Sequence, residues 1–233
     1  MVAQPFFITE ELFSPPQGIT ELIDATNECM PEGLKAGASD LTKFILNRKK
    51  ALSHSVVVAA TGAGVAVAAV PLPFADAVML EPIEATMVQS IAKIFGIGKD
   101  EEAKKFIDTL IKAGTVGAAA KSVVSGIKQL AKQIPVVKIV NAAVAGSIIA
   151  ALGEVSVYAF EQIYLGNRSL DELDWLKNLV NKTLSEGVSE KLNDMVKALK
   201  ESSDAKDAIK VVVDAFGTYE EELASADKLT VTR

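Results

Sequence analysis

Two long uncharged stretches and a series of amphipathic segments make up most of this chain. Residues Ala51 to Ala75 carry no formal charge and are mostly Ala, Val and Gly. A second uncharged stretch lies between Lys138 and Glu154. Elsewhere apolar residues recur at every third or fourth position, which is the spacing of an amphipathic helix. The pattern therefore predicts an all-α protein.

The first long helix is expected to start at Ser39, a favourable N-cap residue. Its apolar stripe begins with Leu41, Phe44 and Ile45. The helix is expected to continue through the uncharged stretch as far as the Pro-Leu-Pro step at 71–73, because proline breaks helices.

Three more helices are expected before residue 167. The first covers 74–95, should be started or kinked by Pro82, and ends at Gly96, a good C-cap residue. The second opens at Lys99 and runs to 133, and the third covers 136–164. Each half of the chain then contains a small-residue helix, a proline corner and a helix that ends on an aromatic residue near glycine. We interpret this arrangement as two packed helical hairpins.

Amphipathic helices follow the hairpins. Capping boxes at 169–172 and 218–221, in which Ser or Thr precedes Glu by three residues, mark two helix starts. Apolar periodicity predicts further helices over 188–200 and 205–216.

Three parts are therefore expected along the chain. Residues 1–38 form an N-terminal segment, 39–166 a helical hairpin domain, and 167–233 a C-terminal helical appendage.

Composition narrows the function classes. The net charge of −6 argues against a general nucleic-acid binder, which needs a basic field. Cys29 is the single cysteine, so no internal disulfide can form, and the expected compartment is the reducing cytoplasm. Residues 1–13 lack the basic start and apolar run of a signal peptide.

Motifs for catalysis are missing. Gly98-Lys99 is followed by Asp and lacks the first glycine of a P-loop, and Val67 stands where a dinucleotide fingerprint needs its third glycine. His54 is the only histidine, so a zinc site has too few ligands, and pairing with Cys29 as a nucleophile is disfavoured. We expect no enzyme activity, no metal and no cofactor.

Several carboxylates border the hairpins. A cluster of them could bind a metal or act as acid and base, but the Glu-x-x-His spacing of carboxylate bundles is missing. We favour solvated acids that cap helix ends or pair with lysines. Asp76 and Glu84, together with Pro82, are expected to orient the first hairpin corner. The acids considered are Asp76, Glu81, Glu84, Glu154 and Glu161.

The uncharged hairpins and a run of bases suit a membrane or a partner helix. Small residues let helix backbones approach closely, in water or in lipid. Lysines between 112 and 138, with no acid among them, fit either anionic lipid or a solvated helix face, and the solvated face is favoured. We favour a soluble fold that associates with membranes over a stably spanning one. The candidate binding residues are Gly62, Gly64, Val67, Pro71, Pro73, Phe74, Lys121, Lys128 and Lys132.

The proline corner carries a family resemblance. The segment 70–76 (VPLPFAD), followed by 80–83 (LEPI), Met87 and Phe95-Gly96, resembles the helical domain of unknown function 697 over about residues 45–166. Glu84 stands where that family usually has Gln. The family is commonly attached to Ras-like GTPases and is distantly similar to the helical part of immunity-related GTPases.

A second resemblance lies upstream. Residues 18–23 (GITELI) and Met30-Pro31-Glu32 are similar to the last helix of a Ras-like G domain. The P-loop, the switch residues and the guanine-reading motif are missing, so the resemblance implies no GTPase activity for this chain.

Together these observations predict a non-catalytic helical effector or membrane-associating domain of a GTPase system. Its expected partners are a membrane surface or a GTPase or other protein, and not nucleic acid, and its exposed small-residue hairpins favour self-association. The expected location is cytoplasmic, peripheral or integral at a membrane. A pore-forming or membrane-inserting protein is the main alternative, and a lipid-binding helical protein is a further one.

Overall fold

The computed structural model describes residues 32–69, 80–98, 100–116, 137–188 and 205–216, with Leu22, Ala25, Lys191, Met195, Ala198 and Leu223 besides. These residues form helices and the turns between them, without any strand, which confirms the all-α class. The helices are α2 (Glu32–Ala69), α3 (Glu81–Phe95), α4 (Glu101–Val116), α6 (Val137–Tyr164), α7 (Leu173–Lys182), the π-helical turn η3 (Thr183–Gly187) and α9 (Ala205–Phe216).

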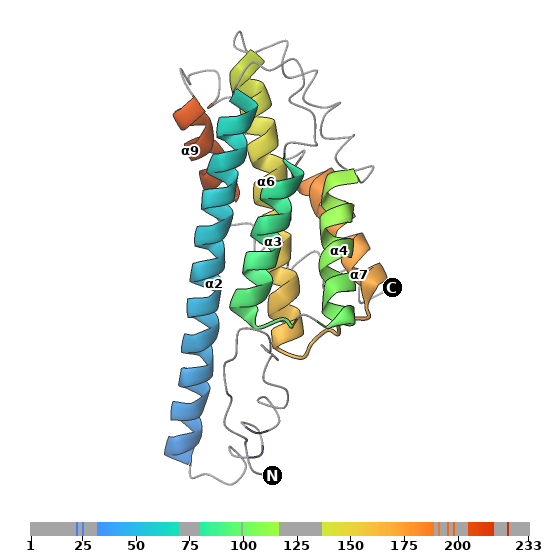
Figure 1. Ribbon diagram of the computed structural model, residues 1–233. Helices are drawn as coiled ribbons and strands as arrows, with labels where there is room; N and C mark the ends of the chain where they lie inside the picture. The colour runs from blue at the N-terminus through green and yellow to red at the C-terminus, as the bar shows by residue number, and fades with distance from the viewer. Residues whose placement is uncertain are drawn as a thin grey trace.

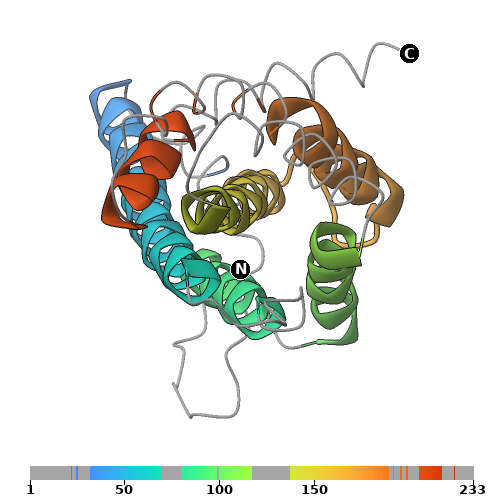
Figure 2. The same cartoon turned by 90° about the horizontal axis from the view of Figure 1, so that it is seen from above.

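Helix α6 lies at the centre of the bundle. Viewed from above, α2, α3, α4, α7 and α9 surround it (Figure 2). The helices run nearly along one direction, and α2 extends past the others at its N-terminal end (Figure 1). Helix α6 contacts α2 most extensively and also packs on α9 and α3.

The sequence of α6 explains its central place. Residues 142–161 are buried except Val144, and apolar side chains lie on every side of the helix. A helix that is apolar all round must be covered on all its faces. Its small residues permit this packing, since a Cβ added at Gly153 would lie 2.6 Å from Val57 of α2 and 3.1 Å from Met87 of α3.

The turn between α3 and α4 forms as the sequence predicts. Gly96 adopts φ 82°, the left-handed conformation that glycine favours, and its N–H donates to the carbonyls of Ala92 and Lys93. Asp100 then caps α4, because its Oδ1 accepts a hydrogen bond from the N–H of Ala103 at 2.7 Å. This short connection places α3 and α4 side by side.

Two helix starts differ from expectation, and one agrees with it. Helix α2 begins at Glu32, so Ser39 lies inside it, although Gly33 and Gly37 are poor helix formers. Pro82 lies in the first turn of α3 and so starts the helix, which is the first of its two expected roles, and does not kink it. Helix α7 begins at Leu173 with Glu172 as its N-cap, since the Ser169 hydroxyl donates to Asp171 and does not accept from a helix N–H. The other half of the predicted capping box forms, because the Ser169 N–H donates to Glu172 Oε1 at 3.0 Å.

The C-terminal helices share the core of the bundle. Helix α9 covers 205–216 as predicted and packs on α6 and α2, while α7 packs on α4. Leu176, Val180, Val212 and Phe216 belong to the same buried cluster as the residues of α6. The helix implied at 18–23 by the resemblance and the helix predicted over 188–200 lie mostly outside the described residues, and the segment 117–133 and the capping box at 218–221 lie wholly outside them.

Candidate functional site

The outer face of α2 is apolar and exposed. Its large side chains are Leu41, Phe44, Ile45, Leu52 and Val58, with exposed fractions from 40% to 62%. They recur at helical spacing and lie on one side of α2, with exposed alanines between and beyond them. We call these five residues, together with Ala51, Ser55, Ala59, Ala63 and Ala66, the outer face.

The exposure of α2 contrasts with the burial of α6. Two helices in the described part of the chain are long and apolar enough to cross a membrane, within Ser39–Ala68 and Ala142–Tyr164. The second is 89% buried inside the bundle, so core packing accounts for its composition. The first is only 28% buried, so core packing does not account for the apolar character of α2.

Basic residues stand where the uncharged part of α2 begins. Lys43 and Arg48 are exposed, and neither makes an ion pair within the described residues. Lys49 points inward, donates a hydrogen bond to the carbonyl of Ile94 and lies 5.1 Å from the ring centroid of Tyr164. Burial lowers the pKa of Lys49 below its usual value. Arg48, seven residues after Leu41, therefore lies among the residues of the outer face, whereas Lys43, seven residues before Lys50, lies on the opposite side of the same end of α2.

The inner face of α2 carries charged groups toward α6. Lys50 Nζ lies 3.2 Å from Glu161 Oε1, and His54 Nδ1 lies 3.1 Å from Glu154 Oε1. Both glutamates are buried, at 10% and 8% side-chain exposure, so each ion pair with α2 offsets part of the cost of burying a carboxylate. These two contacts fix how α2 is rotated on α6.

Glu84 is buried without a full set of partners. It projects from the first turn of α3, is 2% exposed, and its Oε2 has no hydrogen-bond partner within the described residues. Burial, with a smaller contribution from the charge of Glu81, raises the pKa of Glu84 to about 7. The hydroxyls of Ser53 and Thr61 on α2 are also buried and unpartnered in the described structure.

These positions correct part of the sequence interpretation. Solvated acids were expected, yet Glu84, Glu154 and Glu161 are buried because α6 and the first turn of α3 face the core. Glu161 does pair with a lysine, as expected, whereas Glu154 pairs with the histidine. The sequence holds a signal for these contacts. Lys50 and His54 are four residues apart and share one face of α2, and Glu154 and Glu161 are seven apart and share one face of α6.

The predicted binding residues are only partly described. Gly64 is buried, and an added Cβ there would lie 2.1 Å from Ile149, so it packs α2 on α6. Gly62 and Val67 are half-buried, and Pro82 is exposed. The positions outside the described residues are Pro71, Pro73, Phe74, Asp76, Lys121, Lys128 and Lys132.

The described residues form no metal site, since no three His, Cys, Asp or Glu side chains converge in them. His54 lies beside a carboxylate and not beside a nucleophile, and Cys29 lies outside the described part.

Comparison with known proteins identifies a family whose function is unknown. A family model described as a domain of unknown function (DUF697) matches residues 41–186. This range contains α3, α4, α6 and α7 and all of the outer face. No curated protein and no solved structure matches the chain.

Proposed function

Since this chain belongs to the DUF697 family, whose function is unknown, we propose a function from its geometry: it is a non-catalytic domain that docks on anionic membrane surfaces through the outer face of α2. The exposed apolar side chains enter the interface between headgroups and acyl chains. Arg48 contacts the anionic headgroups, and Lys43, on the opposite side of the helix, adds positive charge at this end of α2.

The difference in burial between α2 and α6 carries this proposal. Both helices are apolar enough for lipid, but α6 is 89% buried inside the bundle, whereas α2 is 28% buried and leaves the rest of its apolar surface exposed. Each large side chain of the outer face is about half exposed, and removing it from water contributes about 1 kcal/mol, half of the value for complete burial. Five such residues and two bases are enough for reversible docking.

The inner face of α2 favours a helix that lies in the membrane plane. A spanning α2 would carry Lys50 and His54 into the hydrocarbon, where charged groups are costly. An in-plane helix leaves both residues paired with Glu161 and Glu154 inside the bundle.

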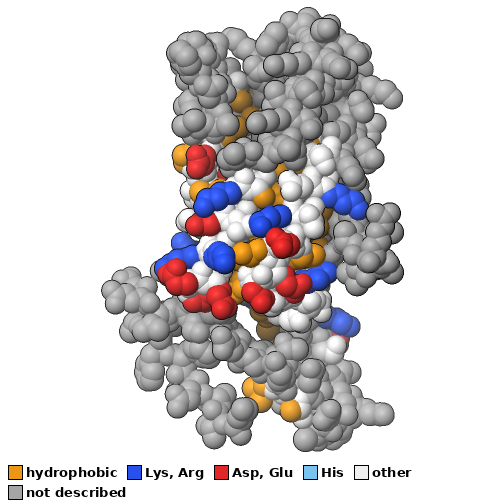
Figure 3. Space-filling model, turned by 90° about the vertical axis from the view of Figure 1, so that its right-hand side faces the viewer, with side chains coloured by type: hydrophobic (Ala, Val, Ile, Leu, Met, Phe, Trp, Pro, Cys, Tyr) orange, Lys and Arg blue, Asp and Glu red, His pale blue; other side chains and the backbone are white. Residues whose placement is uncertain are grey.

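The other faces of the bundle support the choice of α2. The side that carries α4 and α7 displays interspersed acidic and basic side chains, which suits water (Figure 3). Insertion of α6, as a pore-forming protein would require, is disfavoured because it would expose the core of the whole bundle. A protein surface that covers the outer face is the competing occupant.

The family context adds a second part to the proposal. The domain acts as the membrane-docking effector part of a GTPase system and hydrolyses no nucleotide itself. Calorimetric titration of the full chain with GTP and Mg²⁺ should give no binding heat. Saturable heat would contradict the non-catalytic assignment.

Sedimentation with vesicles tests the docking. The full chain should pellet with vesicles that contain anionic lipid, and salt should release it. Substituting Leu41, Phe44 and Ile45 together by Ser should weaken binding about 100-fold, which corresponds to about 3 kcal/mol. The variant K43E/R48E should also bind weakly.

The matched control reverses charge elsewhere. Lys105 and Lys112 are exposed on α4, so K105E/K112E changes net charge equally and should bind vesicles nearly as the wild type does. Equal loss in both double variants would show that only net charge matters, and would contradict docking by α2. Failure of the unaltered chain to pellet would also contradict it.

A further inference from the structure

A cleft separates α3 from α4, away from the outer face of α2. Its volume is about 540 Å³, within the range of small-molecule sites. Helix α4 packs more closely on α7 than on α3, which leaves this space open. The apolar lining consists of Ala92, Ile97, Gly98 and Ile107.

The polar lining is ordered along the cleft. Helices α3 and α4 contribute matching triplets, at 89, 92 and 93 and at 104, 107 and 108, each spaced three and four residues apart. Because the helices are antiparallel, Lys93 and Lys104 lie toward the turn at Gly96. Gln89 and Asp108 lie at the other end. Over this one helical turn, about 6 Å long, the lining thus changes from cationic to acidic with Ala92 and Ile107 between, and Ile97 and Gly98 lie at the cationic end.

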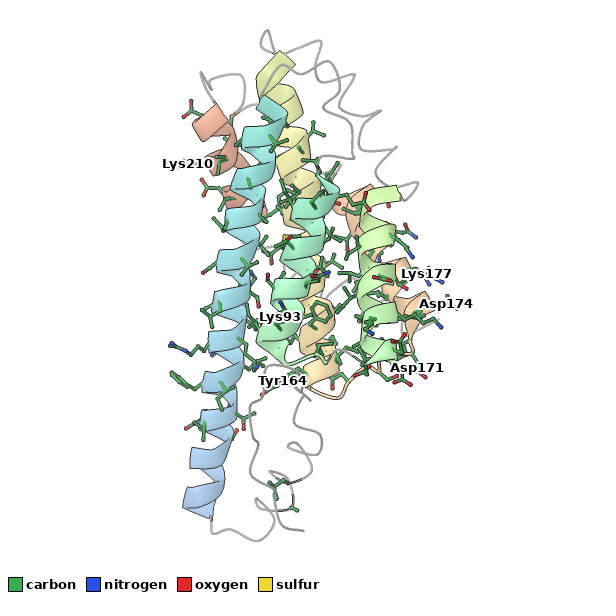
Figure 4. The ribbon with its side chains drawn as sticks, viewed as in Figure 1. Lys93, Tyr164, Asp171, Asp174, Lys177 and Lys210 are labelled. Atoms are coloured by element: carbon green, nitrogen blue, oxygen red, sulfur yellow. The ribbon has the colours of Figure 1, made fainter. Side chains whose placement is uncertain are left out.

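The two lysines differ in what they offer a ligand. Lys104 Nζ donates to Glu101 Oε1 at 2.8 Å, and this hydrogen bond raises the pKa of Lys104. Lys93 is exposed at the end of α3 and makes no ion pair within the described residues (Figure 4). Lys93 is therefore the group that can receive an anion.

We propose that this cleft binds a single-chain anionic amphiphile, with its anionic group on Lys93 and its alkyl chain over Ala92 and Ile107. A carboxylate or a phosphate on the chain meets the same requirement. Asp108 repels the anion from the far end and so sets the direction of the ligand. The site goes beyond membrane docking, because it uses α3 and α4 and no residue of the outer face.

Titration with short amphiphiles tests the proposal on the full chain. Decanoate and decyl phosphate, kept below their micelle concentrations, should bind saturably. Decanol and decyltrimethylammonium should bind at least about tenfold more weakly, since decanol brings no negative charge to Lys93 and decyltrimethylammonium brings a positive one. If decanoate binds better than decyl phosphate, the ligand is a fatty acid, and the reverse order indicates a phospholipid-type head.

Variants distinguish binding in this cleft from binding on the outer face of α2. K93E should weaken decanoate binding at least about tenfold, whereas K105E, on the same α4 surface but outside the lining, should leave it unchanged. I107W should block the cleft. If I107W fails to fold, NMR replaces that variant as the test. Adding decanoate should change the methyl chemical shifts of Ile97 and Ile107 in the wild type but not in K93E.

Three results would overturn the inference. The first is equal binding of decanoate and decanol. The second is loss of decanoate binding in the outer-face Ser variant while K93E binds normally, which would place the ligand on α2. The third is no saturable binding of either anion at 1 mM or below, on the order expected for weak small-ligand sites. None of these depends on whether the chain pellets with vesicles.

Discussion

His54 of α2 and Glu154 of α6 meet with Nδ1 and Oε1 3.1 Å apart, although 100 positions separate them in the chain. The carboxylate is 8% exposed and the imidazole 34% exposed, so the contact lies at the edge of the core. Together with the Lys50–Glu161 pair, it holds the polar side of α2 inward. The apolar outer face consequently points away from the bundle.

Removing His54 should destabilise the bundle through its partner. H54A leaves the buried carboxylate of Glu154 without that contact, and we expect a loss of about 1–3 kcal/mol in the free energy of unfolding. Urea unfolding of H54A, E154Q and the double variant measures the coupling. The exposed Lys177–Asp174 pair on α7 (Figure 4) is the control, and K177A should cost under about 1 kcal/mol. Equal losses in H54A and K177A would contradict a structural role for the α2–α6 contact.

Glu84 should make the bundle less stable as pH rises. Its pKa is about 7 when folded and near 4.5 when unfolded, so the folded state holds the proton more tightly. Stability is then highest below pH 4.5, falls between 4.5 and 7, and levels off above. The span of that fall corresponds to roughly 3 kcal/mol.

Substituting Glu84 isolates this effect. E84Q keeps the shape and removes the charge, so it should be more stable than the wild type at pH 8 by roughly 2–3 kcal/mol and nearly equal at pH 4.5. Urea midpoints at both pH values measure the difference. E102Q, an exposed site on α4, should show no such gain. The difference in unfolding free energy between wild type and E84Q should therefore change between pH 5 and pH 8. No change in that difference would contradict burial of an ionisable Glu84.

Gly153 should not tolerate a methyl group. A Cβ there would lie 2.6 and 2.7 Å from the two Cγ atoms of Val57, where α2, α3 and α6 meet. G153A should therefore destabilise by about 1–3 kcal/mol despite the higher helix propensity of Ala.

Gly37 provides the matched test of Gly153. A Cβ at Gly37 meets nothing within 4 Å, so G37A should stabilise α2 by up to about 1 kcal/mol. Thermal unfolding of the two variants should shift in opposite directions. A stabilising G153A would mean that α2 does not approach α6 as closely as the structure has it.

The sequence predicted the regular parts of the fold because local chemistry determines them. The uncharged run that becomes α6 and the periodic run 205–216 that becomes α9 were both placed within one residue, and Gly96 was identified as a C-cap. These features depend on neighbours only a few residues away. The start of α2 at Glu32 was missed, since Gly33 and Gly37 disfavour a helix and Ser39 is a good cap residue, yet the helix extends upstream past all three, as far as the residue after Pro31.

The candidate site was harder to predict because it depends on which face is covered. The stripe of Leu41, Phe44 and Ile45 has the same periodicity as a core stripe, yet it is exposed. Glu84 stands where a solvated first-turn acid is expected, yet it is buried. Periodicity gives the faces of a helix but not their neighbours, and those neighbours lie more than 100 positions away, as Lys50 and Glu161 do.

A nitroxide scan along α2 on anionic vesicles tests the central claim most directly. With Cys29 replaced by Ser, single cysteines at Phe44, Ala51, Ser55 and Ala59 carry the label, and Lys177 on α7 serves as the solvent-exposed reference. We predict that the four α2 labels enter lipid to similar shallow depths while Lys177 remains in water. Depth that increases steadily along α2 would indicate a spanning helix, and α2 labels as accessible to water as Lys177 would contradict membrane docking altogether.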